Sequence, residues 1–360
     1  MSAKRLAALR RALGASLPRA GALVVSGAEN RRYLSGFRGD AGLLWITATE
    51  AVLLTDSRFW EQAEQEAPDW RLCRVQQRPL LEFLAELCRS AGVQALAFEP
   101  EHLTYAAYRG WRRGLPGVHL VPAPGLVEQL RVRKDAAELA AIRRAAASTD
   151  RALAGWLPLV RPGAVEAELA AELEHRLRLA GAEGAAFPPI VASGPRGAMA
   201  HAIPGAQALR AGELVVVDLG ARVDGYCSDL TRTVLVPGAE PGAEARGVYA
   251  VVQRALAAGL AAVRPGATGV EIDAAARAVI AAAGHGADFG HGLGHGVGLA
   301  VHEGPRLSPL AAAGEGVPEG AVITIEPGIY LPGRFGVRLE ELVAVRAAGA
   351  EVLSAAPLGL

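Results

Sequence analysis

Two apolar runs, far apart in the chain, follow one pattern of hydrophobic and polar positions. The runs are LRAGELVVVDLG (209–220) and VPEGAVITIEPG (317–328), and they align without a gap. Each has a glycine near its start, continues through four aliphatic or β-branched positions and reaches a carboxylate, Asp218 or Glu326. Short apolar runs bounded by turn residues predict buried β-strands. A carboxylate at the end of each buried strand is the first candidate functional feature.

The similarity between these two regions extends upstream. VRPG occurs at 160–163 and again at 263–266, and the eighteen residues after each copy have a helical pattern that closes at Gly181 or Gly284. A repeated order of helix, loop and strand indicates two duplicated halves. We expect a pseudo-twofold axis between the halves, with both carboxylates near it. Isolated buried carboxylates are costly unless they are neutralised, for which metal coordination is the usual means.

The first 127 residues alternate strand-like and helix-like runs. The opening MSAKRLAALRRALGASLPRAG has leucines at helical spacing (Leu6, Leu9 and Leu13), followed directly by the strand-like run ALVVS at 22–26. We interpret the opening as an amphipathic first helix rather than a targeting peptide. Further strand-like runs (GLLWITA, AVLLTDSRF, ALAFEP) alternate with helix-like runs (RPLLEFLAELCRSAG, LTYAAYRGWRRG). This alternation predicts an α/β layer domain with its own sheet.

A turn-rich segment, PAPG at 122–125, separates this region from the long helical run that follows it. The chain of 360 residues is also longer than one hydrophobic core usually supports. We therefore predict an N-terminal α/β domain at 1–127 and a second domain, which contains the duplicated halves, at 128–360.

The composition narrows the class of protein. Apolar residues make up 51% of the chain and charged residues 21%, which is typical of a compact globular protein. Lys and Arg equal Asp and Glu at 37 each, so the chain lacks the basic surplus of a nucleic-acid-binding protein. No apolar stretch approaches the roughly 18 residues of a membrane span. Three scattered cysteines (Cys73, Cys88 and Cys227) fit no full disulfide framework and indicate a reducing, cytoplasmic compartment.

The first carboxylate strand continues into a hairpin, VVVDLGARVDGYCSDLTRTVLV. Asp-Gly at 224–225 is a preferred two-residue hairpin turn. A turn centred there pairs Asp218 with Thr231 and Gly220 with Asp229. The two aspartates are then diagonal neighbours on one face of the ladder, roughly 7–8 Å apart. Both side chains can therefore reach the same metal ions.

The second carboxylate strand also continues into a hairpin, VITIEPGIYLPGRFGVRLEELVAV, which carries Glu326 and Glu340. Their separation is even, so a two-residue loop would place them on opposite faces of the ladder. An odd loop or a bulge must restore the match, and we predict this irregularity within 327–336. A single strand carboxylate is usually a turn or solvated residue. Four carboxylates at the ends of two related hairpins instead indicate a shared metal site.

Between the hairpins, FGHGLGHGVGLAVHEGP at 289–305 contains His291, His295 and His302. Its glycine spacing is not a dinucleotide-binding fingerprint, because valine stands at the third position and no βαβ unit surrounds it. It is also not an HExxH zinc motif. Glycine lets a backbone pass close to another group, so one imidazole can join the carboxylates. A core or loop role remains open for each histidine, and more so for His201 in SGPRGAMAH.

At this point the motifs resemble those of a known family. D(x10)D, GHGxGLxVHE, EPGIY and GVRxE are similar to the motifs of Xaa-Pro peptidases of the pita-bread metallopeptidase family, of the aminopeptidase P and prolidase type. They contain Asp218, Asp229, His295, Glu326 and Glu340. The TDSRF and QAEQE segments at 55–66 resemble the creatinase-type N-terminal domain of that family. The resemblance implies a two-domain α/β chain whose second domain has the α+β pita-bread fold.

The resemblance also implies a dinuclear metal site. Asp229 and Glu340 would bridge two divalent ions, and Asp218 would chelate one of them. His295 and Glu326 would complete the other. Oxygen-rich ligation with one imidazole favours Mn²⁺, with Co²⁺ or Zn²⁺ also plausible. The ions would activate a water molecule for hydrolysis of the amide on the N-terminal side of proline, and Glu326 would carry the proton to the leaving nitrogen.

Other side chains receive roles from the same resemblance. His201 and His302 are expected to hold the substrate carbonyl and the oxyanion, as part of the catalytic machinery. We assign the substrate-binding region to His291, Tyr330 and Arg338, and we expect the last two to orient the ligands rather than to react.

The sequence indicates the substrate and the oligomeric state less clearly than it indicates the metal site. A prolidase needs a group that caps the carboxylate of a dipeptide, whereas aminopeptidase P leaves that end open; Arg196 and Arg334 are candidates, although loop arginines are usually solvated. A binding module without activity and a hydrolase of non-peptide substrates are alternatives on the same fold. A homodimer acting on proline-containing peptides is expected from the resemblance.

Overall fold

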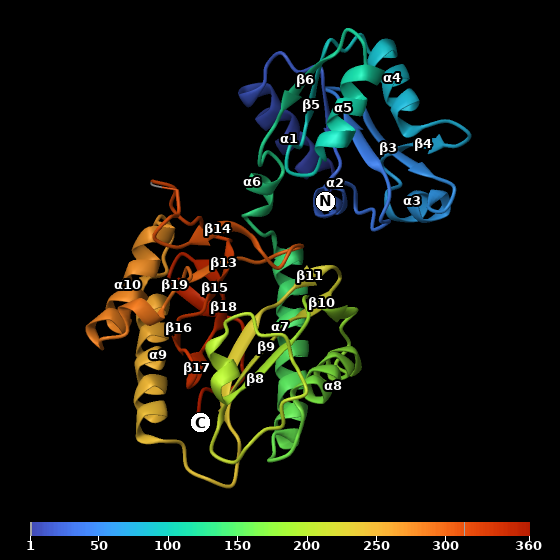
Figure 1. Ribbon diagram of the computed structural model, residues 1–360. Coiled ribbons are helices and arrows are strands. Elements are labelled where there is room, and N and C mark those ends of the chain that lie inside the picture. The colour runs from blue at the N-terminus through green and yellow to red at the C-terminus, as the bar shows by residue number, and fades with distance from the viewer. Residues whose placement is uncertain (1, 313) are drawn as a thin grey trace. The chain divides into compact units, whose positions relative to one another are not determined.

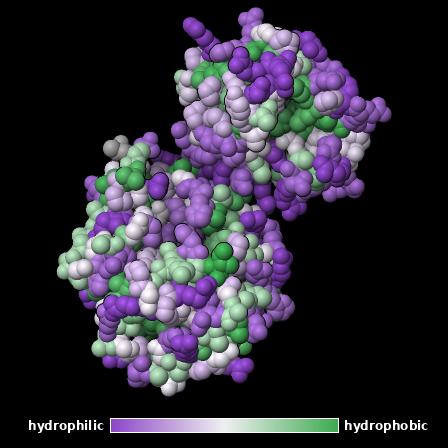
Figure 2. Space-filling view, viewed as in Figure 1, coloured by the Kyte–Doolittle hydropathy of each residue, from purple (hydrophilic) through white to green (hydrophobic). Residues whose placement is uncertain are grey.

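The computed structural model describes residues 2–312 and 314–360. The chain divides into two compact units, Met1–Arg131 and Val132–Leu360 (Figure 1), with the division close to the boundary predicted near residue 127. On the face drawn in Figure 2, hydrophilic residues cover much of both units and apolar residues are scattered among them. Within the described residues, no helix combines the length and the hydrophobicity that a membrane span needs.

The N-terminal unit contains one six-stranded mixed sheet with the order β4-β3-β2-β1-β5-β6. Its strands are β1 (Ala22–Val25), β2 (Leu43–Ile46), β3 (Ala51–Asp56), β4 (Arg71–Val75), β5 (Ala95–Phe98) and β6 (His119–Pro122). The central strands, such as ALVV and LLWI, are fully buried, which is why their apolar runs predict them. The edge strands β4 and β6 are partly exposed, and polar positions interrupt their apolar pattern. The predicted α/β domain with its own sheet is confirmed.

The described residues of this unit form the helices α1 (Ser2–Ser16), α2 (Ala28–Ser35), α3 (Trp60–Glu66), α4 (Leu80–Ser90), α5 (Tyr105–Gly114) and α6 (Glu128–Arg131). The opening of the chain is the predicted first helix, and its Leu9 and Leu13 are buried. Burying an amphipathic stripe supplies most of the stability of such a helix.

The second unit contains two similar halves, each with a helix pair packed on a sheet (Figure 1). The first half consists of α7 (Ala136–Trp156), α8 (Glu166–Leu179), β7 (Gly184–Ala185), β8 (Ile190–Ser193), β9 (Leu214–Leu219), β10 (Ala221–Val223), β11 (Tyr226–Cys227) and β12 (Leu230–Leu235). The second half consists of α9 (Ala243–Ala262), α10 (Gly269–Ala282), β13 (Gly294–Gly296), β14 (Glu303–Leu307), β15 (Val322–Ile325), β16 (Gly328–Leu331), β17 (Phe335–Arg338), β18 (Glu341–Arg346) and β19 (Gly349–Val352).

The two halves have equivalent sheets and separate hydrophobic cores. β9 lies between β8 and β12, and β15 lies in the same way between β13 and β18. The helices α7 and α8 share a core with β8, β9 and β12, whereas α9 and α10 share another with β15 to β18. The duplicated order of helix, loop and strand is therefore confirmed, and it places β9 and β15 at matching positions in the unit.

Equivalent glycines in the two halves have the same backbone conformation. Gly181 and Gly284, which end the paired helices α8 and α10, have φ values of 90° and 87°. A residue in the left-handed conformation after a helix is usually glycine, because in other residues the Cβ atom raises the energy of this conformation. The repeat of the sequence is thus also a repeat of the chain path.

Replacing Gly284 by alanine tests this backbone constraint. An added Cβ at Gly284 meets nothing within 4 Å, so its positive φ is the only source of strain. We expect Gly284→Ala to lower the free energy of unfolding by about 1–2 kcal/mol, measured by urea denaturation. Gly247→Ala is the control, since Gly247 lies inside α9, is exposed and also has open space around it. That change should stabilise slightly, and an equal loss in both variants would contradict the explanation.

Candidate metal centre

The first hairpin has the predicted register. In the antiparallel ladder of β9 and β12, Asp218 stands opposite Thr231. The hairpin continues through β10 and β11 to a turn at Asp224 and Gly225, whose φ values of 49° and 74° are those of a type I′ turn. The predicted turn and the pairing of Asp218 with Thr231 are confirmed. Asp229 precedes β12 directly, which brings it to the same end of the hairpin as Asp218.

The second hairpin brings Glu326 and Glu340 face to face. The ladders on either side of them, β15 with β18 and β16 with β17, keep one register, so the two glutamates stand directly across from each other. The hairpin closes through the three residues 332–334, which confirms an odd loop within 327–336. The N–H of Glu340 donates to the carbonyl oxygen of Thr231 at 3.1 Å, which joins the second hairpin to the first.

Glycine allows His295 to reach these hairpins on the short strand β13. A Cβ at Gly294 would stand 2.1 Å from the Thr324 carbonyl oxygen, and one at Gly296 would stand 2.0 Å from the Gly304 carbonyl oxygen. Neither site tolerates a side chain, because backbone from β15 and from β14 occupies the space. The N–H of His295 donates to Thr324 Oγ1 at 3.0 Å and fixes the strand there. The close backbone approach predicted for this segment is therefore observed.

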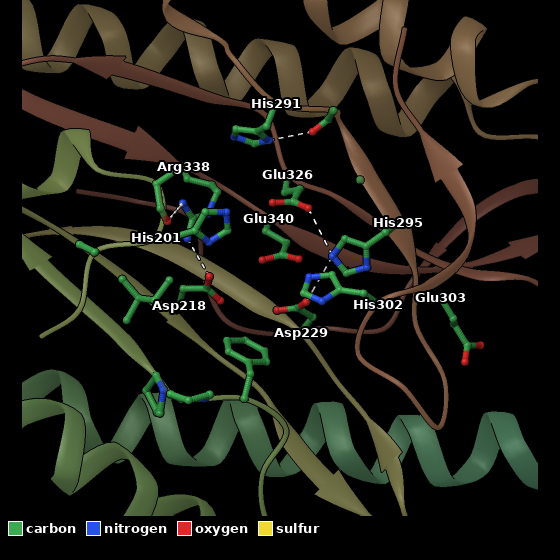
Figure 3. A pocket seen from close by; sticks show the side chains of 18 of the residues that line it. His201, Asp218, Asp229, His291, His295, His302, Glu303, Glu326, Arg338 and Glu340 are labelled. Carbon is green, nitrogen blue, oxygen red and sulfur yellow. Dashed lines mark hydrogen bonds and ion pairs between the residues drawn. The ribbon is translucent and has the colours of Figure 1, made fainter. Parts of the chain in front are cut away.

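Five side chains converge on one space inside the second unit, as Figure 3 shows. Carboxylate oxygens of Asp218, Asp229 and Glu340 lie within 4.8 Å of one another. His295 Nε2 is 3.4 Å from Glu326 Oε1 and 3.7 Å from Asp229 Oδ2. Asp229 is thus common to both groups. The structure brings together all five residues that the motifs single out.

Burial and mutual repulsion oppose the ionisation of these carboxyl groups. Burial is the main cause that raises the pKa of Asp229 and of Glu340, and neighbouring carboxylates raise it further. Burial raises the pKa of Glu326 to about 8. Within residues 2–312 and 314–360, one guanidinium bonds to these carboxylates: Arg338 donates to Asp218 Oδ2 at 2.7 Å. One positive charge cannot balance four carboxylates, so the ionised site requires added protons or cations.

Two buried oxygens and one imidazole nitrogen show that cations suit the site. Asp218 Oδ1 and Glu340 Oε1 have no hydrogen-bond partner among the described residues. Burial lowers the pKa of His295 to about 4, so its ring is neutral near pH 7. The Nδ1 atom lies 3.1 Å from the Gly296 carbonyl oxygen and donates its proton there, which leaves an Nε2 lone pair facing Glu326. A lone pair aimed at an ionised carboxylate is favourable only with a proton or a cation between them. This donor set fits hard divalent ions.

Arg338 and Thr231 orient the carboxylates. Arg338 Nε donates to Thr231 Oγ1 at 3.0 Å, and Thr231 Oγ1 donates to Glu340 Oε2 at 2.7 Å. Arg338 Nη1 also donates to the Ala200 carbonyl oxygen at 3.1 Å. One guanidinium therefore connects Asp218 with the Thr231–Glu340 pair. The sequence reasoning did not single out Thr231, although its place opposite Asp218 in the predicted ladder was a usable signal.

His291 and Tyr330 form a hydrogen-bonded pair beside the carboxylates. Arg338 Nη1 donates to the Tyr330 hydroxyl at 3.1 Å, so this hydroxyl donates its own proton to His291 Nε2 at 2.8 Å. The Nδ1 of His291 then donates to the Gly292 carbonyl oxygen, also at 2.8 Å. Burial lowers the pKa of His291 to about 4, which agrees with a neutral ring. Both of its nitrogens are engaged within the protein.

The carboxylates form one wall of a cavity of about 820 Å³. His201 and His302 are exposed and line the same cavity, and the ring of His302 stacks edge-on to that of His295 with centroids 4.3 Å apart. Another part of the lining is apolar: Phe187, Pro188, Pro189, Ile190, Ile203 and Pro204. The cavity therefore combines polar, chemically active groups with an apolar surface that suits an aliphatic ring or side chain.

The two arginines predicted to cap a substrate carboxylate, and a third one that lines the cavity, differ in their partners. Arg196 donates to the buried Glu166, and Arg334 forms an ion pair with Glu244, so both sequence candidates for a carboxylate-capping group already hold carboxylates. Arg306 lines the cavity, stands opposite His295 in the ladder of β13 and β14, and is exposed. Within residues 2–312 and 314–360 its guanidinium has no hydrogen bond or ion pair. The sequence reasoning missed Arg306.

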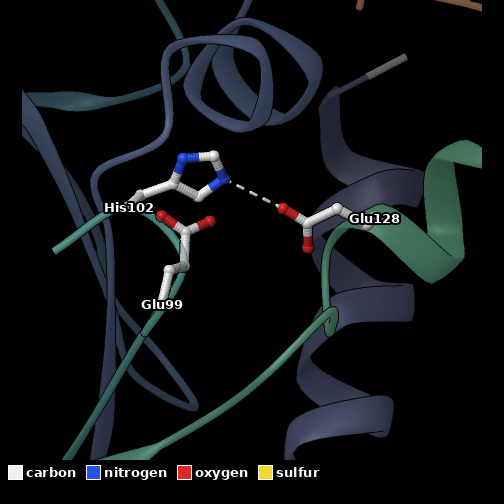
Figure 4. Close-up of side chains that lie close together, drawn as sticks. All are labelled: Glu99, His102 and Glu128. Atoms are coloured by element: carbon white, nitrogen blue, oxygen red, sulfur yellow. Dashed lines mark hydrogen bonds and ion pairs between the residues drawn. The ribbon is translucent and has the colours of Figure 1, made fainter. Parts of the chain in front are cut away.

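A second group of acidic and imidazole side chains, Glu99, His102 and Glu128, lies in the N-terminal unit (Figure 4). Its oxygens already have donors. Glu99 accepts hydrogen bonds from the N–H groups of Ser26 and Gly27 and from the Asn30 amide, and Glu128 accepts from the Asn30 amide and pairs with His102 at 3.1 Å. This group is satisfied as a hydrogen-bonded link between β1, α2, β5 and α6.

The fold and the site define a metallopeptidase, a hydrolase built on a duplicated carboxylate site. The chain belongs to metallopeptidase family M24, whose model matches residues 140–347, and it carries a creatinase/prolidase N-terminal domain at 5–133. The predicted pita-bread fold is confirmed by these matches.

Known proteins resemble the chain over nearly its whole length. An Xaa-Pro dipeptidase of Pyrococcus furiosus is 40% identical, covering 90% of each chain. The solved Xaa-Pro dipeptidase from Bacillus anthracis superposes with a TM-score of 0.95 at 34% identity, covering 100% of this chain and 99% of that one. An X-Pro aminopeptidase from Thermotoga maritima has a TM-score of 0.87 at 35% identity, covering 94% and 97%.

The raised pKa of Glu326 predicts a pH-dependent stability of the metal-free protein. A carboxyl group whose pKa is about 8 when folded and near 4.5 otherwise stabilises the fold when protonated, and this stability is lost as the pH rises through 8. With a chelator present, the thermal midpoint should fall between about pH 5 and pH 8. Glu326→Gln should flatten this fall, because its amide does not titrate. An unchanged pH profile in that variant would contradict the assignment.

Proposed function

We propose that the chain hydrolyses the Xaa-Pro amide bond with two divalent metal ions, and that an Xaa-Pro dipeptide is its preferred substrate. The convergence of four buried or half-buried carboxylates and His295 on one cavity carries the proposal. The full-length similarity to Xaa-Pro dipeptidases and to an X-Pro aminopeptidase supports this choice of substrate. The apolar part of the cavity lining suits a proline ring or an aliphatic side chain.

In this proposal Asp229 and Glu340 each serve both ions. The central place of Asp229 supports this assignment, since its carboxylate adjoins Asp218 and Glu340 on one side and His295 on the other. Asp218 completes one site, and His295 with Glu326 completes the other. Divalent ions held by these residues, with Mn²⁺ favoured by the donor set, would supply Lewis acidity for the activation of water and of the scissile carbonyl.

The remaining steps belong to side chains of the cavity. Glu326 accepts the proton that the attacking water loses and delivers it to the leaving nitrogen. That nitrogen needs a proton, because a proline amide has no N–H of its own. His201 and His302 donate hydrogen bonds to the substrate carbonyl and then to the oxyanion. His291 and Tyr330 border the substrate, while Arg338 keeps Asp218 oriented toward the ions.

Arg306 supports a dipeptide as the substrate. Its exposed guanidinium lines the cavity opposite a proposed metal ligand and has no carboxylate partner among the described residues. In a dipeptide the carboxylate lies one residue beyond the scissile bond, where a free cation at the cavity wall can pair with it. We also expect a homodimer, as the family resemblance indicates.

A metal-reconstitution assay tests the proposed function. After removal of metal with a chelator, Mn²⁺ should restore hydrolysis of Ala-Pro but not of Ala-Ala. A longer Ala-Pro-Xaa-Xaa peptide should be a poorer substrate. Glu340→Gln should lower metal content and reduce kcat/KM at least about 100-fold, whereas Glu351→Gln, on an exposed surface pair, should change neither.

Each outcome of this assay has a definite meaning. Preferred cleavage of the longer peptide would make the enzyme an Xaa-Pro aminopeptidase rather than a dipeptidase. Metal binding with no cleavage of any proline peptide would refute the proposed substrate and favour a non-peptide substrate or a binding role. Full activity of Glu340→Gln with one ion bound would refute the bridging assignment.

The role of Arg306 has its own test. Arg306→Gln should lower kcat/KM for Ala-Pro about 10- to 100-fold, the value of one charged hydrogen bond. It should change hydrolysis of Ala-Pro-amide, which lacks the carboxylate, much less. Arg334→Gln is the matched control, because Arg334 pairs with Glu244. Equal losses on the two substrates would show that Arg306 does not bind the carboxylate.

A further inference from the structure

The buried Arg232 is a second arginine that contacts the proposed metal-binding strands. It lies on β12, between Thr231 and Thr233, and its side chain is 3% exposed. A guanidinium has five N–H donors, and every one of them has an acceptor. The acceptors are the carbonyl oxygens of Thr231 (3.1 Å), Glu340 (2.5 Å), Ala356 (2.6 Å) and Pro357 (3.2 Å) and Glu341 Oε1 (2.8 Å).

These acceptors come from three separate parts of the chain. Two are backbone carbonyls at the point where the hairpins meet, Thr231 O and Glu340 O, and Glu341 follows directly on β18. The other two belong to the segment 354–357, which follows β19. Arg232 therefore connects the backbone of a proposed bridging ligand to a segment that, among the described residues, makes no hydrogen bond to a proposed ligand side chain.

The segment 354–357 is anchored independently of Arg232. Asp150 on α7 accepts hydrogen bonds from the N–H groups of Ala355, at 2.8 Å, and Ala356, at 3.1 Å. Ser354 Oγ donates to Glu341 Oε2 at 2.5 Å, and the N–H of Leu342 donates back to Ser354 Oγ. The segment thus presents two carbonyl oxygens at fixed positions to the guanidinium.

We propose that the segment 354–357, acting through Arg232, is a structural part of the metal centre and positions the Glu340 carboxylate. This inference rests on the proposed function, in which Glu340 bridges the two ions. The carbonyl oxygens of the segment accept hydrogen bonds from Nε and Nη2 of Arg232 and so fix the plane of the guanidinium. In this fixed orientation Nη1 donates to the carbonyl oxygens of Thr231 and Glu340. A bridging ligand must be held within roughly 0.5 Å, and such precision comes from the partners that surround it.

Arginine is specific to this role. Its planar fork of donors reaches five acceptors on three chain segments, whereas the three donors of a lysine radiate from one atom and cannot span them. Arg232 is a positioning residue, since its guanidinium bonds to the backbone of Glu340 and not to the carboxylate.

Shortening the chain separates a positioning role from a general contribution to stability. A chain that ends after Ser354 loses both carbonyls, whereas a control chain that ends after Leu358 keeps them. Titration of each metal-free protein with Mn²⁺ by calorimetry should show a dissociation constant for the weaker ion about 10- to 100-fold higher in the shorter chain only. Arg232→Lys in the full chain should show the same loss.

Combining the two changes gives the sharpest readout. If the segment acts through Arg232, the shorter chain that also carries Arg232→Lys should bind Mn²⁺ no more weakly than Arg232→Lys alone, because neighbours in one network are not additive. If the shorter chain does not fold, Asp150→Ala in the full chain removes the anchor of the segment and should give the same loss of affinity.

The failure of this inference differs from the failure of the proposed function. Equal Mn²⁺ affinity in the two shortened chains, or additive losses in the combined variant, would overturn the role of the segment while the metal centre stands. An unaltered full chain that binds no second ion would overturn the dinuclear centre itself, and this inference with it.

Discussion

The structure depends on one electrostatic constraint, the crowding of four carboxylates, two buried and two half-buried, at a single point. In the described part of the chain one guanidinium, that of Arg338, contacts them, while burial and mutual repulsion raise the pKa of Asp229, Glu326 and Glu340. Such a cluster costs free energy in the metal-free state. The fold tolerates it because two helix-backed sheets with large apolar cores hold the strands around it. The same concentration of negative charge favours the binding of divalent cations at this site.

The duplicated halves solve the geometric part of this problem. In each half a buried strand has a carboxylate at or next to its C-terminal end. The hairpin that follows this strand supplies a second carboxylate. The two hairpins differ in loop length, two residues at 224–225 and three at 332–334, and each length matches the spacing of its own carboxylates. His295 breaks the symmetry, because β13 carries a proposed metal ligand and the equivalent strand β8 carries none.

The polar groups around the carboxylates are of two kinds, buried groups that hold the carboxylates and exposed groups that face the cavity. Arg338 and Thr231 fix the direction of two carboxylates from within the site, and Arg232 fixes their backbone from behind. The exposed groups, His201, His302 and Arg306, face the cavity, where a substrate would meet them. Arg338, Thr231 and Arg232, which hold the carboxylates, are buried, whereas the three groups that face the cavity are exposed.

Local sequence determined the parts of this protein that depend on near neighbours. The Asp-Gly turn set the first hairpin and its register, the even spacing of Glu326 and Glu340 required the odd loop, and the glycines around His295 indicated close backbone contact. Tertiary structure alone decided which distant groups meet. Arg232 bonds to residues 108 and more positions away, and Arg306 differs from Arg196 and Arg334 because it lines the cavity and has no carboxylate partner among the described residues. Turn chemistry and strand alternation act over a few residues, whereas the partner of a long charged side chain is chosen by packing between elements that the local pattern does not place.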